Sequence, residues 1–591
     1  MPSPFTHSTT PPADWDRLFP AERPLPADGV FELGLVLGGT VSAGAYTAGV
    51  VDFLIEALDA WQAAKAAHPG EASVPFWDAR LQTVTGTSGG GVIAALLGRC
   101  LSWRFPHVRA TTSEADARLN PLYEVWVNQL DIRDMLDIAD LQGDDSTRLV
   151  SLLNPKPLER ARDLIVHYED HFDVSQRVQR RYLADPLPLF LTLTNLRGVP
   201  YSTDMGSGLS QHHVSHADHV RIAAYTLGEP GVLRPDEFGA CLNASGKPGY
   251  LPWAEYAKFA LGTSAFPVGF PTRALQRPMA HYQYRPVVIP GADGQGQTVR
   301  PMVPNWGLLP EPAPSHTYNF LVADGGMTNN EPIQLARSEL AGHVGRNPRK
   351  GENARRAVLL IDPFAEVPTL GPEGKQSLFK ELGAMLGTWK EQARYDSRDI
   401  LLATDEDCFS RYMITARRPG AAAGGKSIAT ACASAFGGFL SHAFRRHDFL
   451  LGRLNAQEYL RKKLVLPIGN PLFSAWRQQA SAAQLAHWTV MDGTQPSLPI
   501  IPLLGACATS EPLPAYPRDA FNPQDDDFQN LLGMRIRAVL RQATHDIGPS
   551  GIEGFLAALY LKIGQIFGDD KLQAMVTDWF VDSLRDWDLS D

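Results

Sequence analysis

A serine between glycines stands where an apolar, β-branched run meets a small-residue helix, at Ser88. The pattern Gly-x-Ser-x-Gly is formed by Gly86, Thr87, Ser88, Gly89 and Gly90. Glycines relieve the crowding of a sharp turn between strand and helix. The turn would expose the serine at a helix N-terminus, where free N–H groups and the helix dipole favour negative charge. This arrangement is typical of a nucleophile in acyl transfer, although an ordinary tight turn would also use such glycines.

The proposed nucleophile needs a base, because a serine hydroxyl is a weak nucleophile on its own. Asp324 ends the apolar run 318–323 and precedes Gly325 and Gly326. The carboxyl ends of parallel strands meet at one edge of a sheet, so we expect Asp324 and Ser88 to lie together. Partial burial would raise the basicity of the carboxylate. Two alternatives are open. Asp-Gly is a common turn pair, and a late histidine could complete an α/β-hydrolase triad. The late histidines are His442, His447, His487 and His545.

A second glycine-bearing turn, 38–44, lies between an apolar strand and a helix. Its backbone N–H groups are suited to hold an oxyanion, and we predict this role for Gly38, Gly39 and Thr40. A phosphate-binding P-loop is excluded at this turn. Gly39 and Gly44 have the required spacing, but Ala45 and Tyr46 replace the Lys and Ser/Thr of that motif.

The elements around these turns alternate between short apolar strands and helices. Strands are predicted at 31–37, 81–85, 188–196, 318–323 and 357–361, and helices at 45–66, 89–100 and 253–261. Apolar strands with little polar alternation are typical of a parallel sheet covered on both faces. The sequence therefore predicts an α/β fold with a mostly parallel central sheet.

The order of these motifs resembles the patatin-like phospholipase family. The segments that carry the resemblance are Gly44–Val50, Thr85–Gly90, Ala260–Pro271, Asp324–Gly326 and Asn329–Pro332. The resemblance implies a three-layer fold and a Ser88–Asp324 dyad without histidine. It also implies hydrolysis of phospholipid or lysophospholipid acyl esters through an acyl-enzyme, with no metal and no cofactor.

The glycine turn departs from the family pattern Gly-Gly-Gly-x-Arg/Lys-Gly. Counted back from Gly44, this chain has Gly39, Thr40, Val41, Ser42 and Ala43. The missing basic residue favours either a neutral ester or a basic group from elsewhere in the chain. The altered glycines keep a catalytically weak scaffold open as an alternative.

The resemblance covers residues 31–365, with insertions at about 101–182 and 277–316. We expect residues 1–30 to form an extended arm and residues 366–591 to form a mainly helical region packed on the core. The 591 residues are enough to bury a large core.

Composition limits the partners and the compartment. A net charge of −10 argues against a nucleic-acid partner. Five scattered cysteines without metal-ligand spacing indicate reduced thiols of a cytoplasmic protein. We expect neither a signal peptide nor a membrane-spanning segment. Peripheral contact with a membrane is left open, with a lipid or lysolipid as substrate.

Three further segments compete for a function. Gly420–Ser427 matches the Walker A pattern and is followed by a predicted helix at 428–443, so a nucleotide-gated scaffold is the main alternative. Phe436–Leu460 is rich in Arg, His and aromatic residues and fits either a basic lipid-facing lining or a packed helix pair. Gly554–Phe567 is apolar and fits either a membrane-surface helix or a core helix.

Overall fold

A computed structural model describes most of the chain from Trp15 to Asp591. The residues outside the described part are 1–14, 143–148, 205–209, 225–239, 243–250, 283, 292–293, 295, 310–316, 365–373, 375–387, 389–391, 395, 421–425 and 546–568.

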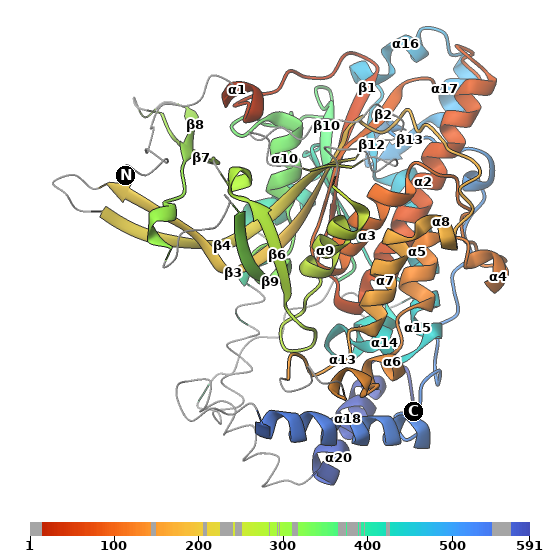
Figure 1. The fold of residues 1–591 in the computed structure, drawn as a ribbon. Coiled ribbons are helices and arrows are strands. Elements are labelled where there is room, and N and C mark those ends of the chain that lie inside the picture. Colours follow the sequence, from red (N-terminus) through yellow and green to blue (C-terminus); the bar gives the residue numbers. More distant parts are fainter. Residues whose placement is uncertain are drawn as a thin grey trace.

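The centre of the molecule is a nine-stranded sheet in the order β11-β10-β1-β2-β3-β4-β5, to which β9 and β6 are joined through β3 (Figure 1). Its strands are β1 (Val30–Leu37), β2 (Asp78–Gly86), β3 (Leu187–Asp204), β4 (Ser210–Ala224), β5 (Ala240–Leu242), β6 (Arg273–Pro278), β9 (Thr317–Asp324), β10 (Arg356–Asp362) and β11 (Arg411–Thr415).

The sheet has a parallel half and an antiparallel half. In the parallel half, β11, β10, β1, β2 and the beginning of β3 run in one direction. In the antiparallel half, β4 pairs along β3, and β9 pairs with both the later part of β3 and β6. The prediction of an α/β fold with a largely parallel central sheet is confirmed. The expectation that the strand ending at Asp324 belongs to the parallel set is wrong, because β9 is antiparallel to β3.

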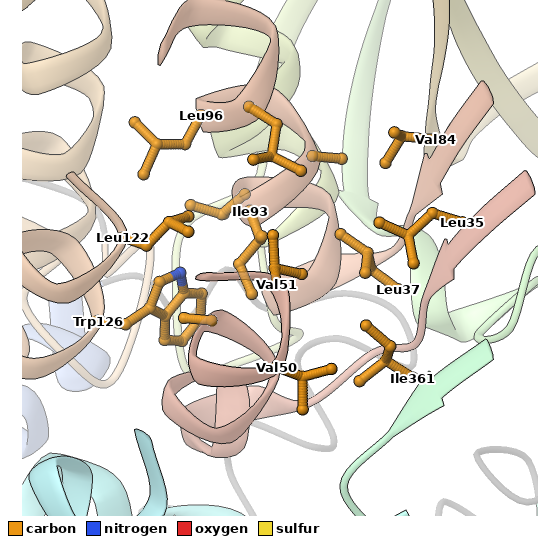
Figure 2. Close-up of a cluster of buried hydrophobic side chains, with 14 of the residues drawn as sticks. Leu35, Leu37, Val50, Val51, Val84, Ile93, Leu96, Leu122, Trp126 and Ile361 are labelled. Atoms are coloured by element: carbon orange, nitrogen blue, oxygen red, sulfur yellow. The ribbon is translucent and has the colours of Figure 1, made fainter. Parts of the chain in front are cut away.

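Helices cover both faces of the parallel half. Side chains alternate along β1: Val36 packs with α10 (Ile333–Ala341) on one face, and Leu35 and Leu37 belong to the core cluster on the other. That second face carries α2 (Gly44–Ala67) and α3 (Ser88–Cys100), as Figure 2 shows. The result is helix, sheet and helix in three layers.

Helix α2 lies at the centre of the second helical layer. It packs along α15 (His442–Lys462), whose chain passes so close that a Cβ on Gly49 would lie 1.9 Å from the Phe449 carbonyl oxygen. The stretch Val41–Ala67 is long and apolar enough to cross a bilayer, and 89% of its most apolar window is buried inside the protein. A core helix passes the same test, so the burial accounts for its apolar character.

The remaining elements surround this core. The helices and single turns are α1 (Trp15–Leu18), η1 (Val41–Ala43), α4 (Glu114–Ala117), α5 (Pro121–Tyr123), η2 (Glu124–Asn128), α6 (Ile132–Leu136), η3 (Ala139–Leu141), α7 (Lys156–Val166), α8 (Tyr168–His171), α9 (Trp253–Thr263), η4 (Met279–Tyr282), η5 (Trp306–Leu308), η7 (Gly325–Met327), α12 (Ser397–Thr404), η8 (Ala429–Ala431), α13 (Cys432–Ala435), α14 (Gly437–Leu440), η9 (Pro471–Phe473), α16 (Ser474–Arg477), α17 (Ala482–Trp488), η10 (Gly505–Ala508), α18 (Asp526–His545) and α20 (Asp569–Asp586). The smaller strands are β7 (Arg285–Pro290), β8 (Gln297–Met302), β12 (Val465–Pro467), β13 (Val490–Asp492) and β14 (Gln495–Pro499).

The description of residues 366–591 as mainly helical is incomplete. Strand β11 extends the central sheet next to β10, and β12, β14 and β13 form a small sheet of their own. The excursion 277–316 contains the antiparallel pair β7–β8. The predicted division into domains remains a prediction.

The predicted helix at 428–443 is also wrong, because the segment is broken into η8, α13, α14 and the start of α15. Ala433, Ser434 and Ala435 have φ values of 51°, 55° and 71°, which interrupt a right-handed helix. The Ser42 hydroxyl holds this path, because it accepts a hydrogen bond from the Gly438 N–H at 2.8 Å and donates to the Ala435 carbonyl oxygen.

Candidate active site

Ser88 stands at a tight turn between β2 and α3. Its φ is +52°, a left-handed conformation that is uncommon for a residue other than glycine. The Ser88 N–H donates to Thr263 Oγ1 at 3.0 Å, and the Thr87 N–H donates to the Leu37 carbonyl oxygen at 3.1 Å. Backbone strain of this kind clusters at functional sites.

The glycines of the turn are required by close packing. A Cβ on Gly90 would lie 2.4 Å from the Leu37 carbonyl oxygen, and one on Gly86 would lie 2.5 Å from the Gly90 carbonyl oxygen. A Cβ on Gly89 would lie 2.3 Å from Thr40 Oγ1. The loop after β1 therefore packs directly on the serine turn.

Asp324 accepts a hydrogen bond from Ser88. Ser88 Oγ donates to Asp324 Oδ2 at 2.5 Å, and the two residues are 7% and 4% exposed. The other carboxylate oxygen accepts from the Gly326 N–H at 2.7 Å. The Asp324 backbone is held on both sides, because its N–H donates to the Ala265 carbonyl oxygen at 2.9 Å and its carbonyl accepts from Thr194 Oγ1 at 2.7 Å.

The long strand β3 explains how the two residues meet. Its first part pairs with β2, where Leu191 lies opposite Gly86. Beyond that point β2 has ended, and β9 takes its place beside β3 with Asp324 opposite Leu193. Both site residues therefore lie beside the same short stretch of β3. The sequence argument reached the right pair through a wrong premise, since β9 arrives from the opposite direction.

The late histidines hold other partners. His442 lies beside Asn128 and Glu114, and His447 bonds to Asp448 and Arg418. His487 packs edge-on against its neighbour Trp488. The side chain of His545 lies outside the described residues. Among the described residues, the Ser88 hydroxyl therefore bonds to the aspartate Asp324 and to no late histidine.

The N–H groups of Gly38 and Gly39, for which an oxyanion role is predicted, already have backbone partners. The Gly38 N–H donates to the Ile361 carbonyl oxygen and the Gly39 N–H donates to the Asn330 carbonyl oxygen, both at 3.1 Å. These bonds anchor the loop to β10 and to the segment after Asp324. Thr40 differs from the two glycines, because its N–H donates to no backbone oxygen within the described part of the chain. Its hydroxyl is fully buried and packs against Gly89.

Val41 was missed by the sequence analysis. Its φ is +48°, an outlier for a β-branched residue, and its side chain shares a cavity with Ser88. A signal was available, because counting back from Gly44 places Val41 at a position where the resembled family has a glycine.

An apolar cavity opens beside Ser88. Its lining consists of uncharged residues, namely Val41, Ser88, Gly89, Val92, Val125, Trp126, Leu130, Leu158, Ala161, Ser264, Phe266, Phe270 and Phe439. The free volume is about 30 Å³, enough for one or two water molecules. Phe439, from the broken segment before α15, packs edge-on against Phe270 and Phe436 at one side of the cavity.

Two buried carboxylates support the loop behind the site. Glu331 and Asp362 share Arg394, at 3.4 Å and 3.0 Å. Burial, together with the negative charge of Asp362, raises the pKa of Glu331 to about 7. Asn330, the next residue, accepts the Gly39 N–H and packs its side chain against Gly39 and Gly326. This cluster joins the loop after β1 to the loop that follows Asp324.

Of the other sequence candidates, Phe436–Leu460 reaches the cavity through Phe439, and the other two lie wholly or partly outside the described residues. In the Walker A match, Ala421–Gly425 lies outside the described part and Lys426 is exposed. Gly554–Phe567 also lies outside it. In Phe436–Leu460, Arg453 is fully buried and bonds to Asp52, Glu56 and Glu511, which favours the packed-helix interpretation. The described residues contain no group of three or more His, Cys, Asp or Glu side chains arranged to hold a metal ion.

Comparisons with known proteins give one clear relative. No protein-family model matches the chain. The solved structure of VipD from Legionella pneumophila aligns over 96% of this chain and 92% of its own at 11% identity, but its TM-score of 0.16 carries no argument about fold. The uncharacterized protein y4iI of Sinorhizobium fredii is 32% identical over 547 residues, which cover 86% of this chain and 75% of the relative. The chain therefore belongs to the same protein family as y4iI.

Proposed function

We propose that this protein is a serine acyl hydrolase that cleaves lipid acyl esters with a Ser88–Asp324 dyad. The observation that carries the proposal is the 2.5 Å hydrogen bond from Ser88 Oγ to Asp324 Oδ2 at the edge of an apolar cavity. The strained turn at Ser88 and the sequence resemblance to patatin-like phospholipases support it.

In this mechanism Asp324 acts first as a general base. It takes the proton from Ser88 Oγ as the oxygen attacks the ester carbonyl carbon, and the carbonyl oxygen gains negative charge. Asp324 then returns the proton to the departing alcohol, which leaves an acyl group on Ser88. In the second half of the reaction, Asp324 takes a proton from water as the water oxygen attacks the acyl carbon. The bond between that carbon and Ser88 Oγ then breaks, Asp324 returns the proton to Ser88 Oγ, and the carboxylic acid leaves.

The oxyanion is assigned to the turn formed by Thr40 and Val41 rather than to Gly38 and Gly39. The N–H groups of the two glycines are already used within the fold. Thr40 packs on Gly89, and Val41 adopts its strained conformation beside Ser88. Each oxyanion donor of this type contributes about a hundredfold or more to the rate.

The cavity favours an acyl chain as the part of the substrate nearest Ser88. Its described lining carries no charge, so it suits a hydrocarbon chain and offers nothing to a phosphate. The small free volume implies that Phe439 and its aromatic neighbours move when a long chain enters. A neutral or short-chain ester would need less movement.

Lipid mass spectrometry with total membrane lipid tests the proposal. Wild-type protein should deplete acyl-ester lipids and release fatty acids, and Ser88→Ala should abolish both changes while remaining folded. Ser264→Ala is the matched control, because Ser264 lines the same cavity but donates its hydroxyl to the Ala260 carbonyl oxygen. Equal lipid turnover by wild type and Ser88→Ala would overturn the proposal.

A further inference from the structure

A large open groove lies at the opposite end of β2 from Ser88. It has a free volume of about 1310 Å³ and is lined by the second half of α2, the start of β2 and the segments 104–107 and 177–182. Its cationic residues are Lys65, Arg80, Arg104, Arg177, Arg180 and Arg181, and its carboxylates are Asp59 and Asp78.

The two carboxylates neutralise two of the six cations. Lys65 Nζ pairs with Asp78 at 2.6 Å, and Arg180 forks onto Asp59 with distances of 3.0 to 3.2 Å. The other four arginines are exposed, and within the described part of the chain no carboxylate lies within ion-pair distance of them. Six cations less two carboxylates leave the groove with four positive charges, in a chain whose net charge is −10.

The walls that carry these arginines are rigidly built. The buried Arg180 donates to the carbonyl oxygens of Leu101 and Trp103 at 2.6 Å and 3.0 Å, which ties the two segments together. Gln62 from α2 bonds to the Gln179 carbonyl oxygen and to the Arg181 N–H. Lys65 and Arg180 therefore serve to hold the walls together, and the four arginines without a carboxylate partner project from these walls.

One of the unpaired arginines is also oriented. The guanidinium of Arg177 lies 4.9 Å from the centre of the Trp103 ring, a stacking geometry that leaves its N–H groups available to a ligand. Arg104 follows Trp103 in the chain, and its backbone N–H donates to the Gln176 carbonyl oxygen. The backbones of Arg104 and Arg177 are therefore neighbours on one wall of the groove.

We infer that this groove binds a ligand that carries several phosphate groups. A guanidinium presents a planar fork of N–H donors that matches phosphate oxygens. Four such groups around one groove exceed what a single phosphate can use, and the groove is larger than a phosphate requires. The same chemistry is found in a soluble polyphosphate compound and in the phosphomonoester headgroup of a lipid.

This site is separate from the proposed active site. Strand β2 begins at Asp78 in the groove and ends at Gly86 beside Ser88, so the two sites lie about 27 Å apart at the usual rise of a strand. The inference therefore does not rest on the proposed hydrolase activity.

Two probes test the inference with the full-length protein. Sodium tripolyphosphate is titrated by calorimetry, and co-sedimentation is measured with phosphatidylcholine vesicles that do or do not contain phosphatidic acid. The test variant is Arg104→Gln/Arg177→Gln/Arg181→Gln. The control Arg118→Gln/Arg300→Gln/Arg477→Gln removes the same charge from exposed arginines that do not line the groove.

Wild-type protein should bind one or both probes, more weakly as salt is added. The groove variant should lose about tenfold or more in affinity, and the control variant should stay close to wild type. Loss of tripolyphosphate binding identifies a soluble ligand, and loss of vesicle binding alone identifies a lipid headgroup. The single variant Arg104→Gln, with a smaller loss, replaces the triple variant if that protein does not fold. Absence of binding to both probes by wild type, or equal loss in groove and control variants, would overturn the inference.

Discussion

The two halves of the central sheet contribute the two site residues in different ways. In the parallel half, Ser88 follows β2 directly, and its place is set by local sequence: a strand, two flanking glycines and a helix. In the antiparallel half, Asp324 reaches the site because β9 pairs with the later part of β3. One residue is positioned locally and the other by long-range pairing, so the hydrogen bond between Ser88 and Asp324 depends on the seam between the halves, which is the stretch of β3 that pairs with both β2 and β9.

The two halves also differ in how they bury charge. In the antiparallel half, Asp218 accepts hydrogen bonds from Arg277 and Tyr282 and balances one buried cation. In the parallel half, Glu331 and Asp362 share one arginine, and the pKa of Glu331 rises. The first cluster pairs one buried cation with one carboxylate, whereas in the second burial and the neighbouring Asp362 act together on the pKa of Glu331.

The largest expected effect comes from Asp324→Asn. The amide keeps the size of the side chain but cannot take the Ser88 proton, so we expect kcat for ester hydrolysis to fall about 10³-fold to 10⁴-fold. Initial rates on a lysophospholipid measure the loss, and circular dichroism checks the fold. A variant with more than a tenth of wild-type activity would exclude Asp324 as the base.

The next largest effect is on the stability of the antiparallel half. Asp218→Asn leaves the buried Arg277 without its charged partner, which should lower the free energy of unfolding by about 3–5 kcal/mol. Urea denaturation measures the change. Glu255→Gln is the control, because its pair with Lys258 is exposed and should contribute less than about 1 kcal/mol. Similar losses of unfolding free energy in the two variants would show that the buried pair contributes no more to stability than the exposed one.

The raised pKa of Glu331 predicts that stability depends on pH. The pKa of Glu331 is about 7 in the folded protein and near 4.5 when unfolded, so the folded state binds more protons between these values. The contribution of Glu331 to stability therefore falls as pH rises from about 4.5 to about 7. Glu331→Gln should be more stable than wild type at pH 8, by at most about 3 kcal/mol, and the difference should vanish near pH 4. A pH-independent difference would contradict this account.

The smallest expected effect is on kcat, from removing one contact between β3 and Asp324. Thr194 lies on β3 and donates its hydroxyl to the Asp324 carbonyl oxygen at 2.7 Å. Thr194→Val should lower kcat about tenfold with little change in KM, because it loosens the base without touching substrate. Thr194→Ser should restore the rate. A change in KM alone would place Thr194 in substrate binding instead.

Local parts of this fold could be predicted from sequence, but the pairing of β9 with β3 could not. The apolar run before Gly86 and the glycines around Ser88 specify a strand, a turn and a helix within twenty residues. The apolar run before Asp324 predicts a strand but carries no information on its direction. Strand β3 was expected to end near Leu196, yet it continues through Arg197 and Pro200 to Asp204. This extension pairs with β4, whereas β9 pairs with residues 193–195, inside the predicted strand.

The hydrogen bonds of the turn after β1 and the broken segment near Ala433 escaped prediction for a related reason. The N–H groups of Gly38 and Gly39 are used by Ile361 and Asn330, which are distant in the chain. The left-handed path of Ala433–Ala435 is held by Ser42 and, through the Ala433 N–H, by the Ser583 hydroxyl. Contacts across hundreds of residues decide both conformations, and no local pattern encodes them.

The most direct test of the central claim is covalent labelling of the nucleophile. Protein is incubated with an alkyl fluorophosphonate, which reacts with activated serines, and the modified peptide is identified by mass spectrometry. The account predicts a single adduct on Ser88, absent in Ser88→Ala, strongly slowed in Asp324→Asn and unchanged in Ser264→Ala. Labelling of Asp324→Asn at the wild-type rate, or an adduct on another residue, would contradict it.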